Sequence, residues 1–166
     1  MTPGQAAEAV KRKMAELKRF REEDVPDIIG TEAVNHFNES FVNEGFTDKG
    51  LVKWQDVKRR NPNSEWYGFS AGNKKRFSPT RASDKILTGE TSELKNSIHY
   101  VVKPDRVTVR SDKPYASVHQ FGEPAKVFGK KAFTMKARPF IGRSAVLENE
   151  IRNKIIREYK KIITQQ

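Results

Sequence analysis

Residues 94–142 read LKNSIHYVVKPDRVTVRSDKPYASVHQFGEPAKVFGKKAFTMKARPFIG, and this stretch decides the fold. It opens with two runs of alternating apolar residues, 98–102 and 107–109, which Lys103-Pro104-Asp105-Arg106 joins. Side chains two residues apart lie on one face of a strand, so the two runs predict a β-hairpin with a Pro-Asp turn.

A short helix and a second hairpin are expected after the first hairpin. Ser111 supplies a capping oxygen, Pro114 suits a first helical turn, and Tyr115, Val118 and Phe121 follow at helical spacing until Gly122. Residues 127–128 and 133–135 then flank Gly129-Lys130-Lys131, which predicts a looser hairpin with a basic tip.

Three short motifs within and beside these elements carry a resemblance. They are Leu94-Lys95-Asn96-Ser97-Ile98, Tyr115-Ala116-x-x-His119-Gln120-Phe121-Gly122 and Ala137-Arg138-Pro139-Phe140-Ile141-Gly142. In this order and spacing they resemble the phage virion morphogenesis (tail completion) family over roughly the C-terminal half of the chain. One departure is that Thr91-Ser92 stands where that family usually has Thr-Gly, although Thr88-Gly89 lies just upstream.

The resemblance implies a structural protein without chemistry of its own and without a cofactor. Such a subunit joins the end of a phage tail to the head, with tail and head-connector proteins as partners, and is expected to form a homo-oligomeric ring. It implies a location in the bacterial host cytoplasm during assembly and in the virion afterwards. The motif residues to which it gives a structural role are Leu94, Ser97, Ile98, Tyr115, Ala116, His119, Gln120, Phe121, Gly122, Pro139, Phe140 and Gly142.

Composition indicates one domain that does not bury all of its surface by itself. The chain has 166 residues, of which 36% are hydrophobic, and a mean hydropathy of −0.78. These values are low for a compact monomer and indicate a polar arm or a surface that meets other subunits. With no cysteine there is neither a disulfide framework nor a thiolate metal site. No apolar run is long enough to cross a bilayer, and the N-terminus lacks the apolar core of a signal peptide, so no membrane partner is expected.

The formal net charge of +11 predicts a polyanionic partner or an acidic protein surface. The basic residues are clustered rather than mixed with acids, at residues 58–60, 74–76, 130–131 and 160–161. Two alternatives stay open: contact with DNA, for which the chain would act as a basic nucleic-acid-binding module, and a charge that serves solubility alone.

Helical periodicity appears at both ends of the chain. Residues 6–21 place Val10, Met14 and Leu17 on one stripe, and a second helix is expected to begin at Asp24 and Pro26. Its apolar residues recur every fourth position until Gly45, which predicts core packing; they are Ile29, Ala33, Phe37 and Phe41. A last helix is expected from the cap Ser144, with an apolar face of Leu147, Ile151, Ile155, Tyr159 and Ile162.

The sequence therefore predicts an α+β fold. We expect a small antiparallel sheet with two N-terminal helices and a long C-terminal helix packed on one side, leaving the other sheet face for a partner. The single domain 1–166 would comprise a helical part (1–45), a flexible basic and aromatic arm (46–87) and the hairpin and C-terminal helix (88–166). The expected common core is Ile98, Tyr100, Val107, Val118, Phe121, Phe140, Leu147 and Ile151.

The arm at residues 46–87 shows no periodicity and is rich in Asn, Ser, Gly and Pro, with aromatic residues interleaved among basic ones. Such a composition favours ordering on a neighbouring protein, although stacking on single-stranded nucleic acid and simple tethering are alternatives. The candidates for a protein interface or a polyanion contact are Lys58, Arg59, Arg60, Trp66, Tyr67, Lys74, Lys75, Arg76, Lys130, Lys131 and Arg138. Arg138 precedes a proline at a rigid corner, where a guanidinium suits a bidentate carboxylate contact within or between subunits.

No catalytic arrangement is expected. The three histidines, His36, His99 and His119, lack the paired spacing of a zinc site. We expect His119 and Gln120 to fix the short helix to neighbouring backbone through hydrogen bonds. The chain also lacks a G-x-S-x-G elbow, a Walker-type glycine loop and a cysteine nucleophile, and its scattered carboxylates lie where caps and turns need them.

Overall fold

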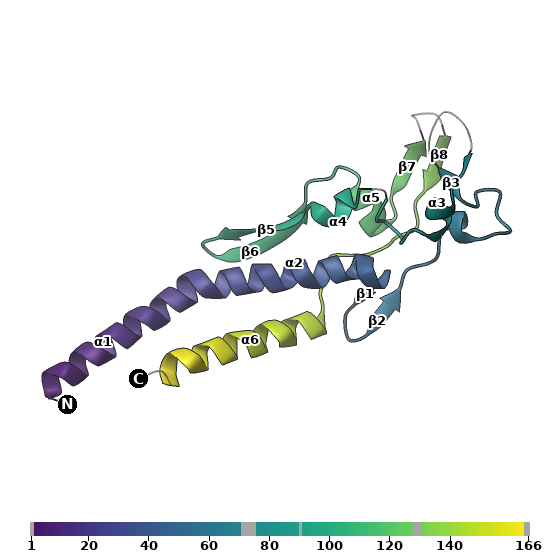
Figure 1. Ribbon diagram of the computed structural model, residues 1–166. Helices are drawn as coiled ribbons and strands as arrows, with labels where there is room; N and C mark the ends of the chain where they lie inside the picture. Colours follow the sequence, from purple (N-terminus) through teal and green to yellow (C-terminus); the bar gives the residue numbers. More distant parts are fainter. Residues whose placement is uncertain (1, 71–75, 90, 128–130, 165–166) are drawn as a thin grey trace.

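A long N-terminal helix runs through the molecule in the computed structural model, which describes residues 2–70, 76–89, 91–127 and 131–164 (Figure 1). It comprises α1 (Pro3–Arg19), a π-helical segment η1 (Phe20–Asp24) and α2 (Val25–Asn43). The predicted break at Asp24 is therefore wrong. Pro26 has no N–H and its ring crowds the carbonyl four residues earlier, but the wider turn, in which the Val25 N–H bonds to the Phe20 carbonyl, accommodates it without ending the helix.

The strands form four separate antiparallel ribbons in the described residues, so the prediction of one small sheet is wrong while the α+β class is confirmed. The ribbons are β1 (Gly45–Thr47) with β2 (Leu51–Lys53), β3 (Phe69–Ser70) with β4 (Arg76–Phe77), β5 (Ile98–Lys103) with β6 (Arg106–Ser111), and β7 (Pro124–Val127) with β8 (Lys131–Thr134). Both predicted hairpins in residues 94–142 are present. Three of the ribbons are too short to offer a long edge on which another strand could pair. Short helices lie between the ribbons along the chain, and these helices keep the ribbons apart.

Those short helices are η2 (Lys58–Arg60), α3 (Pro79–Ser83), α4 (Glu93–Asn96) and α5 (Ala116–Phe121), and the chain ends in α6 (Ala145–Thr164). Gly122 ends α5 as predicted, with a left-handed φ of 73°. Ser144 caps α6 as predicted, because its Oγ accepts the Leu147 N–H at 3.1 Å. A second cap was not predicted: Asp48, in the β1–β2 turn, accepts the Ala145 N–H at 2.9 Å.

Helix α2 is the middle layer of the structure. The ribbon β5–β6 lies along one side of it and α6 runs back along the other (Figure 1). On the hairpin side the Tyr100 ring packs directly on Gly30, and on the α6 side Lys154 pairs with Glu32. The C-terminal helix thus packs on α2 and not on the sheet, contrary to the prediction, because α2 presents residues to both layers.

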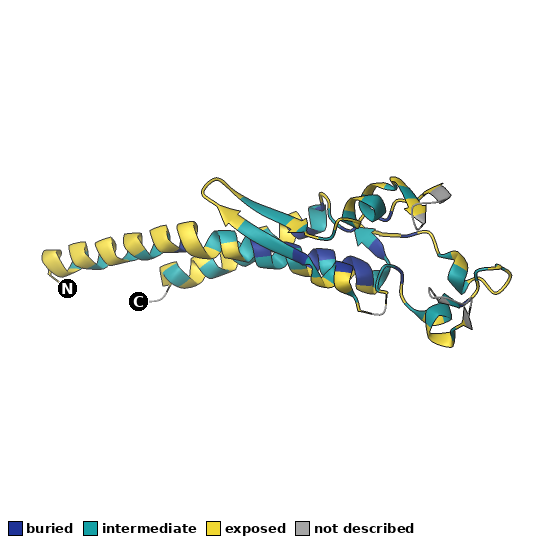
Figure 2. Ribbon diagram, turned by 90° about the horizontal axis from the view of Figure 1, so that it is seen from above, coloured by how far each residue is buried: buried dark blue, intermediate teal, exposed yellow. Residues whose placement is uncertain are grey.

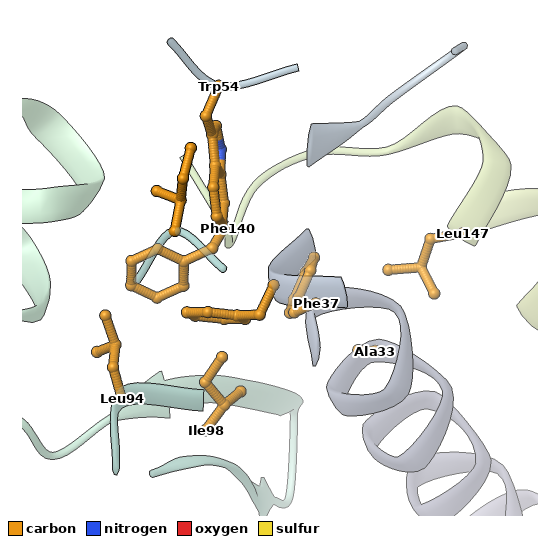
Figure 3. Packing of buried hydrophobic residues seen from close by; sticks show 9 residues of the cluster. Ala33, Phe37, Trp54, Leu94, Ile98, Phe140 and Leu147 are labelled. Carbon is orange, nitrogen blue, oxygen red and sulfur yellow. The ribbon is translucent and has the colours of Figure 1, made fainter. Parts of the chain in front are cut away.

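The core lies at the C-terminal end of α2 (Figure 3). Phe41 of α2 is fully buried, with its ring 5.3 Å from the Phe140 ring and 5.7 Å from the Trp54 ring. The remaining buried members come from α2, from residues 86–98 and from α6; they are Ala33, Phe37, Ile86, Leu94, Ile98 and Leu147. The core role predicted for Phe37 and Phe41 is confirmed.

One predicted core residue is exposed. Ile98, Phe140 and Leu147 are buried as expected, and Ile151 packs against them, whereas Tyr100, Val107 and Val118 are half-buried. Phe121 is 69% exposed, so its core assignment is wrong. The preceding residue, Gln120, turns inward to bond the backbone of residues 140–141, and the next side chain on a helix points about 100° away.

The stretch 46–87 is not the structureless arm that its composition suggested, because it holds β1–β2, η2, β3–β4 and α3. Trp54 is buried, and its Nε1 donates to the Pro139 carbonyl at 2.8 Å. Ile86 is only 2% exposed. Elements of two to five residues are too short to show periodicity, which explains why the sequence pattern did not reveal them.

Candidate interaction surfaces

The free end of the long helix leaves its apolar stripe in solvent. No residue of α1 is buried, as Figure 2 shows for the helix beyond the end of α6, and Val10 and Met14 are 59% and 66% exposed. Farther along, an open groove of about 780 Å³ lies between α1 and α6, lined mainly by Met14, Leu17, Phe20, Val25, Ile155 and Tyr159. Exposed apolar surface of this extent on a helix pair marks an interaction site.

Two of the predicted polyanion contacts, Arg59 and Arg60, bind groups within the chain. Arg59 donates to the carbonyls of Asp84 and Lys85 at 2.8 and 3.0 Å, while burial and then Arg81 lower its pKa. Arg60 forms a two-pronged ion pair with Glu44. Arg59 and Arg60 therefore connect the end of α2 to the loop before residue 86. The clustering of basic residues in the sequence could not distinguish this structural role from a role on the surface.

Glu44 holds three segments together, and its role was not predicted. Besides Arg60, its carboxylate accepts the Ile86 N–H at 2.6 Å. Burial alone would raise the pKa of Glu44, but these hydrogen bonds and the charge of Arg60 outweigh it, so the pKa lies below its ordinary value. The left-handed φ of 52° at this residue turns the chain out of α2.

The other candidates include exposed and half-buried residues of the former arm, two residues that begin strands, and three residues outside the described parts of the chain. Lys58 is exposed; the Trp66 ring packs edge-on against Phe69 at 5.1 Å, and the Tyr67 ring lies 5.3 Å from Phe77. Arg76 and Lys131 begin β4 and β8. Lys74, Lys75 and Lys130 lie outside the described residues.

The three sequence motifs meet around α5. The Gln120 side chain accepts the N–H groups of Phe140 and Ile141 at 3.0 and 3.1 Å and donates to the Ile141 carbonyl at 2.6 Å. The Arg138 N–H bonds the His119 carbonyl at 2.7 Å. Leu94 and Ile98 are buried against Phe140 in the shared core.

The remaining motif residues serve close packing and turns. Ser97 and Ser111 join α4 to β6 through their hydroxyls, 2.6 Å apart. Gly142 lies against the Phe46 ring, and Gly122 lies so close to the backbone of residues 135–137 that a Cβ there would be 2.8 Å from the Ala137 nitrogen. Tyr115 stands before α5 with its ring edge-on to His119, Ala116 packs on the core, and Pro139 is exposed.

Arg138 and His119 differ from expectation. Arg138 is only 6% exposed, and its Nε and Nη2 donate to the Gln55 carbonyl at 3.3 and 3.0 Å, so its two-pronged contact is to backbone and not to a carboxylate. The His119 ring does not fix the helix, since its buried Nδ1 has no hydrogen-bond partner in the described structure. Burial and then the nearby Arg138 charge lower the His119 pKa. Gln120 anchors α5 through its side chain, and His119 does so through its carbonyl, which accepts the Arg138 N–H.

The positive charge is unevenly distributed along the chain. Residues 46–144 carry 21 Lys and Arg against 9 Asp and Glu, whereas residues 1–45 carry 6 against 9. The end of the molecule formed by β3–β4, α3 and β7–β8 belongs to the basic part and lies opposite the free end of α1 (Figure 1). Helix α1 itself carries 5 Lys and Arg against 2 Glu, so the two ends differ in apolar exposure but are both positive, and the acidic residues of 1–45 lie mainly between them in η1 and α2.

Sites for small groups are sparse in the described part of the chain. Its His, Asp and Glu residues form no cluster of three that could hold a metal ion. None of its helices is both long and apolar enough to span a membrane.

Comparison with known proteins bears on the same region. A model of the phage virion morphogenesis family matches residues 57–160, which is more than half of the chain and includes all three motifs. No curated protein and no solved structure matches the chain significantly.

Proposed function

The chain belongs to the phage virion morphogenesis family, and on that premise we propose that it is a tail completion subunit that joins the tail end to the head connector as part of a ring. A structural role in virion assembly follows from the family. We propose further that the subunit performs no catalysis and that tail and connector proteins are its partners.

The observation that carries the ring proposal is the uncovered apolar surface of α1 and α6. Val10, Met14 and Ile163 are each at least half exposed. Together with the groove they form an apolar surface whose exposure to water is unfavourable in free energy for an isolated subunit. A neighbouring copy of the chain is the occupant that we propose for this surface.

Charge favours contact of the basic end of one copy with an acidic surface of the next. Two basic ends brought together would repel, because residues 46–144 carry 21 Lys and Arg against 9 Asp and Glu. The α1–α2 junction instead carries an acidic run, Glu22-Glu23-Asp24, that is exposed. A contact between different surfaces of identical chains repeats from copy to copy, and it gives a closed ring when the rotation between neighbours closes.

Imaging of virions tests the assignment. Particles produced without this protein are expected to be heads without tails beside loose tails, and supplying the protein should restore joined particles. Intact, joined particles in its absence would refute the role. The chain has no cysteine, so single cysteines placed at Met14 and at Lys126 allow clean cross-linking. Mixing the two variants should give a cross-linked dimer if the basic end of one copy meets α1 of the next, because each chain carries one thiol.

The basic end supports a second proposal, in which it faces DNA at the junction between head and tail. Lys58, Lys126 and Lys136 are exposed, in line with a solvated polyanion contact. Replacing these three with Gln should leave folding intact, because solvated charges contribute little to stability. The neutral variant also carries Gln at the basic residues of 74–76 and 130–131. DNA leakage from purified particles is the measurement, and full retention by the neutral variant would limit the charge to solubility.

A further inference from the structure

A recess lined by several arginines lies beside Arg138. It is a pocket of about 470 Å³ between α5, η2 and residues 86–94. Its charged and polar lining residues include Arg59, Arg81, Arg138 and His119, together with Glu93, whose carboxylate pairs with Lys113 at 2.7 Å. Its apolar lining residues include Leu94 and Met135.

The positive charge in this pocket is only partly neutralised. Arg81 pairs with Asp84 at 3.3 Å, but Arg59 and Arg138 bind backbone carbonyls and form no ion pair with any described residue. Arg138 is the critical group, because its side chain is more than nine-tenths buried. Burial lowers the pKa of Arg138, and the carboxylate whose charge acts on it, Asp56, forms no ion pair with it, so an incoming anion gains more here than at an exposed arginine.

Two nitrogen atoms remain for such an anion, and that of His119 donates in the tautomer with the proton on Nδ1. The Nη1 of Arg138 makes no hydrogen bond to the described protein atoms, since only Nε and Nη2 reach Gln55. The neighbouring His119 Nδ1 is buried and also lacks a partner there. A carboxylate has two oxygens in one plane and can bind such donors together.

We propose that this pocket receives a carboxylate side chain presented by a neighbouring protein of the virion. A nucleic-acid phosphate fits less well, because a phosphate on a duplex is flanked by sugars and cannot enter a recess between helices. An Asp or Glu side chain stands at the end of a flexible stem and can. The delivery by a neighbour rests on the proposed function, whereas the anion site itself does not.

The three histidines of the chain provide the readout. We would titrate the isolated protein with acetate at fixed pH and ionic strength, with chloride as the balancing ion, and follow the imidazole signals by NMR. The His119 signals should shift and saturate at millimolar acetate, while those of His36 and His99 stay in place. Saturation at lower concentration with inorganic phosphate than with acetate would overturn the choice of carboxylate.

Variants locate the site. Arg138→Gln should abolish the saturable shift, and Arg143→Gln, at a side chain that is 88% exposed, should leave it unchanged. Because Arg138→Gln removes a buried group, a misfolded variant would also lose the shift. A second pair of variants therefore leaves Arg138 in place. Met135→Glu places a tethered carboxylate in the pocket and should block acetate, whereas the neutral Met135→Gln should not. Acetate binding that persists in Met135→Glu would overturn the site.

An assembly assay then tests whether a neighbouring protein fills the anion site. Met135→Glu occupies the pocket, so it should lower the yield of joined particles at least tenfold relative to Met135→Gln. Equal yields from both variants would overturn delivery of the carboxylate by a neighbour. The acetate titration does not depend on whether loss of the whole protein gives tailless heads, and the yield comparison is made only if it does, so failure of this inference and failure of the proposed function remain distinguishable.

Discussion

The two halves of one continuous helix differ in whether their apolar residues are buried. α1 and α2 both carry apolar residues three or four positions apart, yet α1 buries none of them and α2 buries Phe37 and Phe41. The difference comes from covering segments: Trp54, Phe140 and Leu147 reach α2 from distant parts of the chain. Periodicity identifies an apolar face, but only tertiary structure shows whether the chain itself covers that face.

Removing a covering residue should give the largest loss of stability. Phe140→Ala empties a site that is 1% exposed, next to the Phe41 and Trp54 rings, and should cost about 3–5 kcal/mol of unfolding free energy. Phe121→Ala is the matched control, because this ring is 69% exposed and should lose under about 0.5 kcal/mol. Denaturant unfolding measures both, and equal losses would contradict the buried and exposed assignments.

The polar link at the end of α2 should have the next largest effect. Glu44→Gln removes the charge that Arg60 and the Ile86 N–H bind and should cost about 1.5–3 kcal/mol. Since the folded pKa of Glu44 lies below its ordinary value of 4.5, its contribution is present above that value and is lost as the pH falls through the folded pKa. Unfolding curves across this range should therefore converge for the two proteins at acidic pH. Parallel curves would exclude a role for the Glu44 charge.

Disturbing the contact between α2 and the hairpin should give the third-largest loss of stability. A Cβ at Gly30 would lie 2.2 Å from the Tyr100 ring, so Gly30→Ala should cost about 1–2 kcal/mol even though alanine favours helix. Gly4→Ala, in the uncovered α1, meets nothing within 4 Å and should stabilise the protein by up to about 1 kcal/mol. Opposite signs in thermal unfolding are expected. A gain at both positions would mean that the hairpin does not press on α2.

The local pattern predicted elements whose determinants are close in sequence. The hairpin of residues 98–111, the stop at Gly122 and the cap at Ser144 depend on neighbours within a few positions, and the structure has all of them. The α+β class followed from the same elements. The motifs at residues 94–142 likewise led to the family that the comparison confirms.

Features decided by distant residues could not be predicted. Arg59 and Arg60 read as part of a basic surface cluster, but their partners at Glu44 and residues 84–85 are remote in sequence. The inward turn of Gln120, which exposes Phe121, depends on the backbone of residues 140–141. Pro26 signals a helix start in isolation, and only the π-helical turn before it reveals a continuous helix.

The smallest stability effect is expected where the apolar face is uncovered. Val10→Gln with Met14→Gln replaces side chains that are 59% and 66% exposed, and should change the unfolding free energy of the isolated subunit by less than about 0.5 kcal/mol. If a second copy covers this face, the same double variant should lose self-association in sedimentation experiments and fail to restore joined particles. Arg12→Gln is the control, because it lies about 160° around α1 from both residues and is also exposed. A double variant that is less stable as a monomer would mean that the chain covers its own stripe. One that assembles normally would mean that α1 ends in solvent within the virion as well.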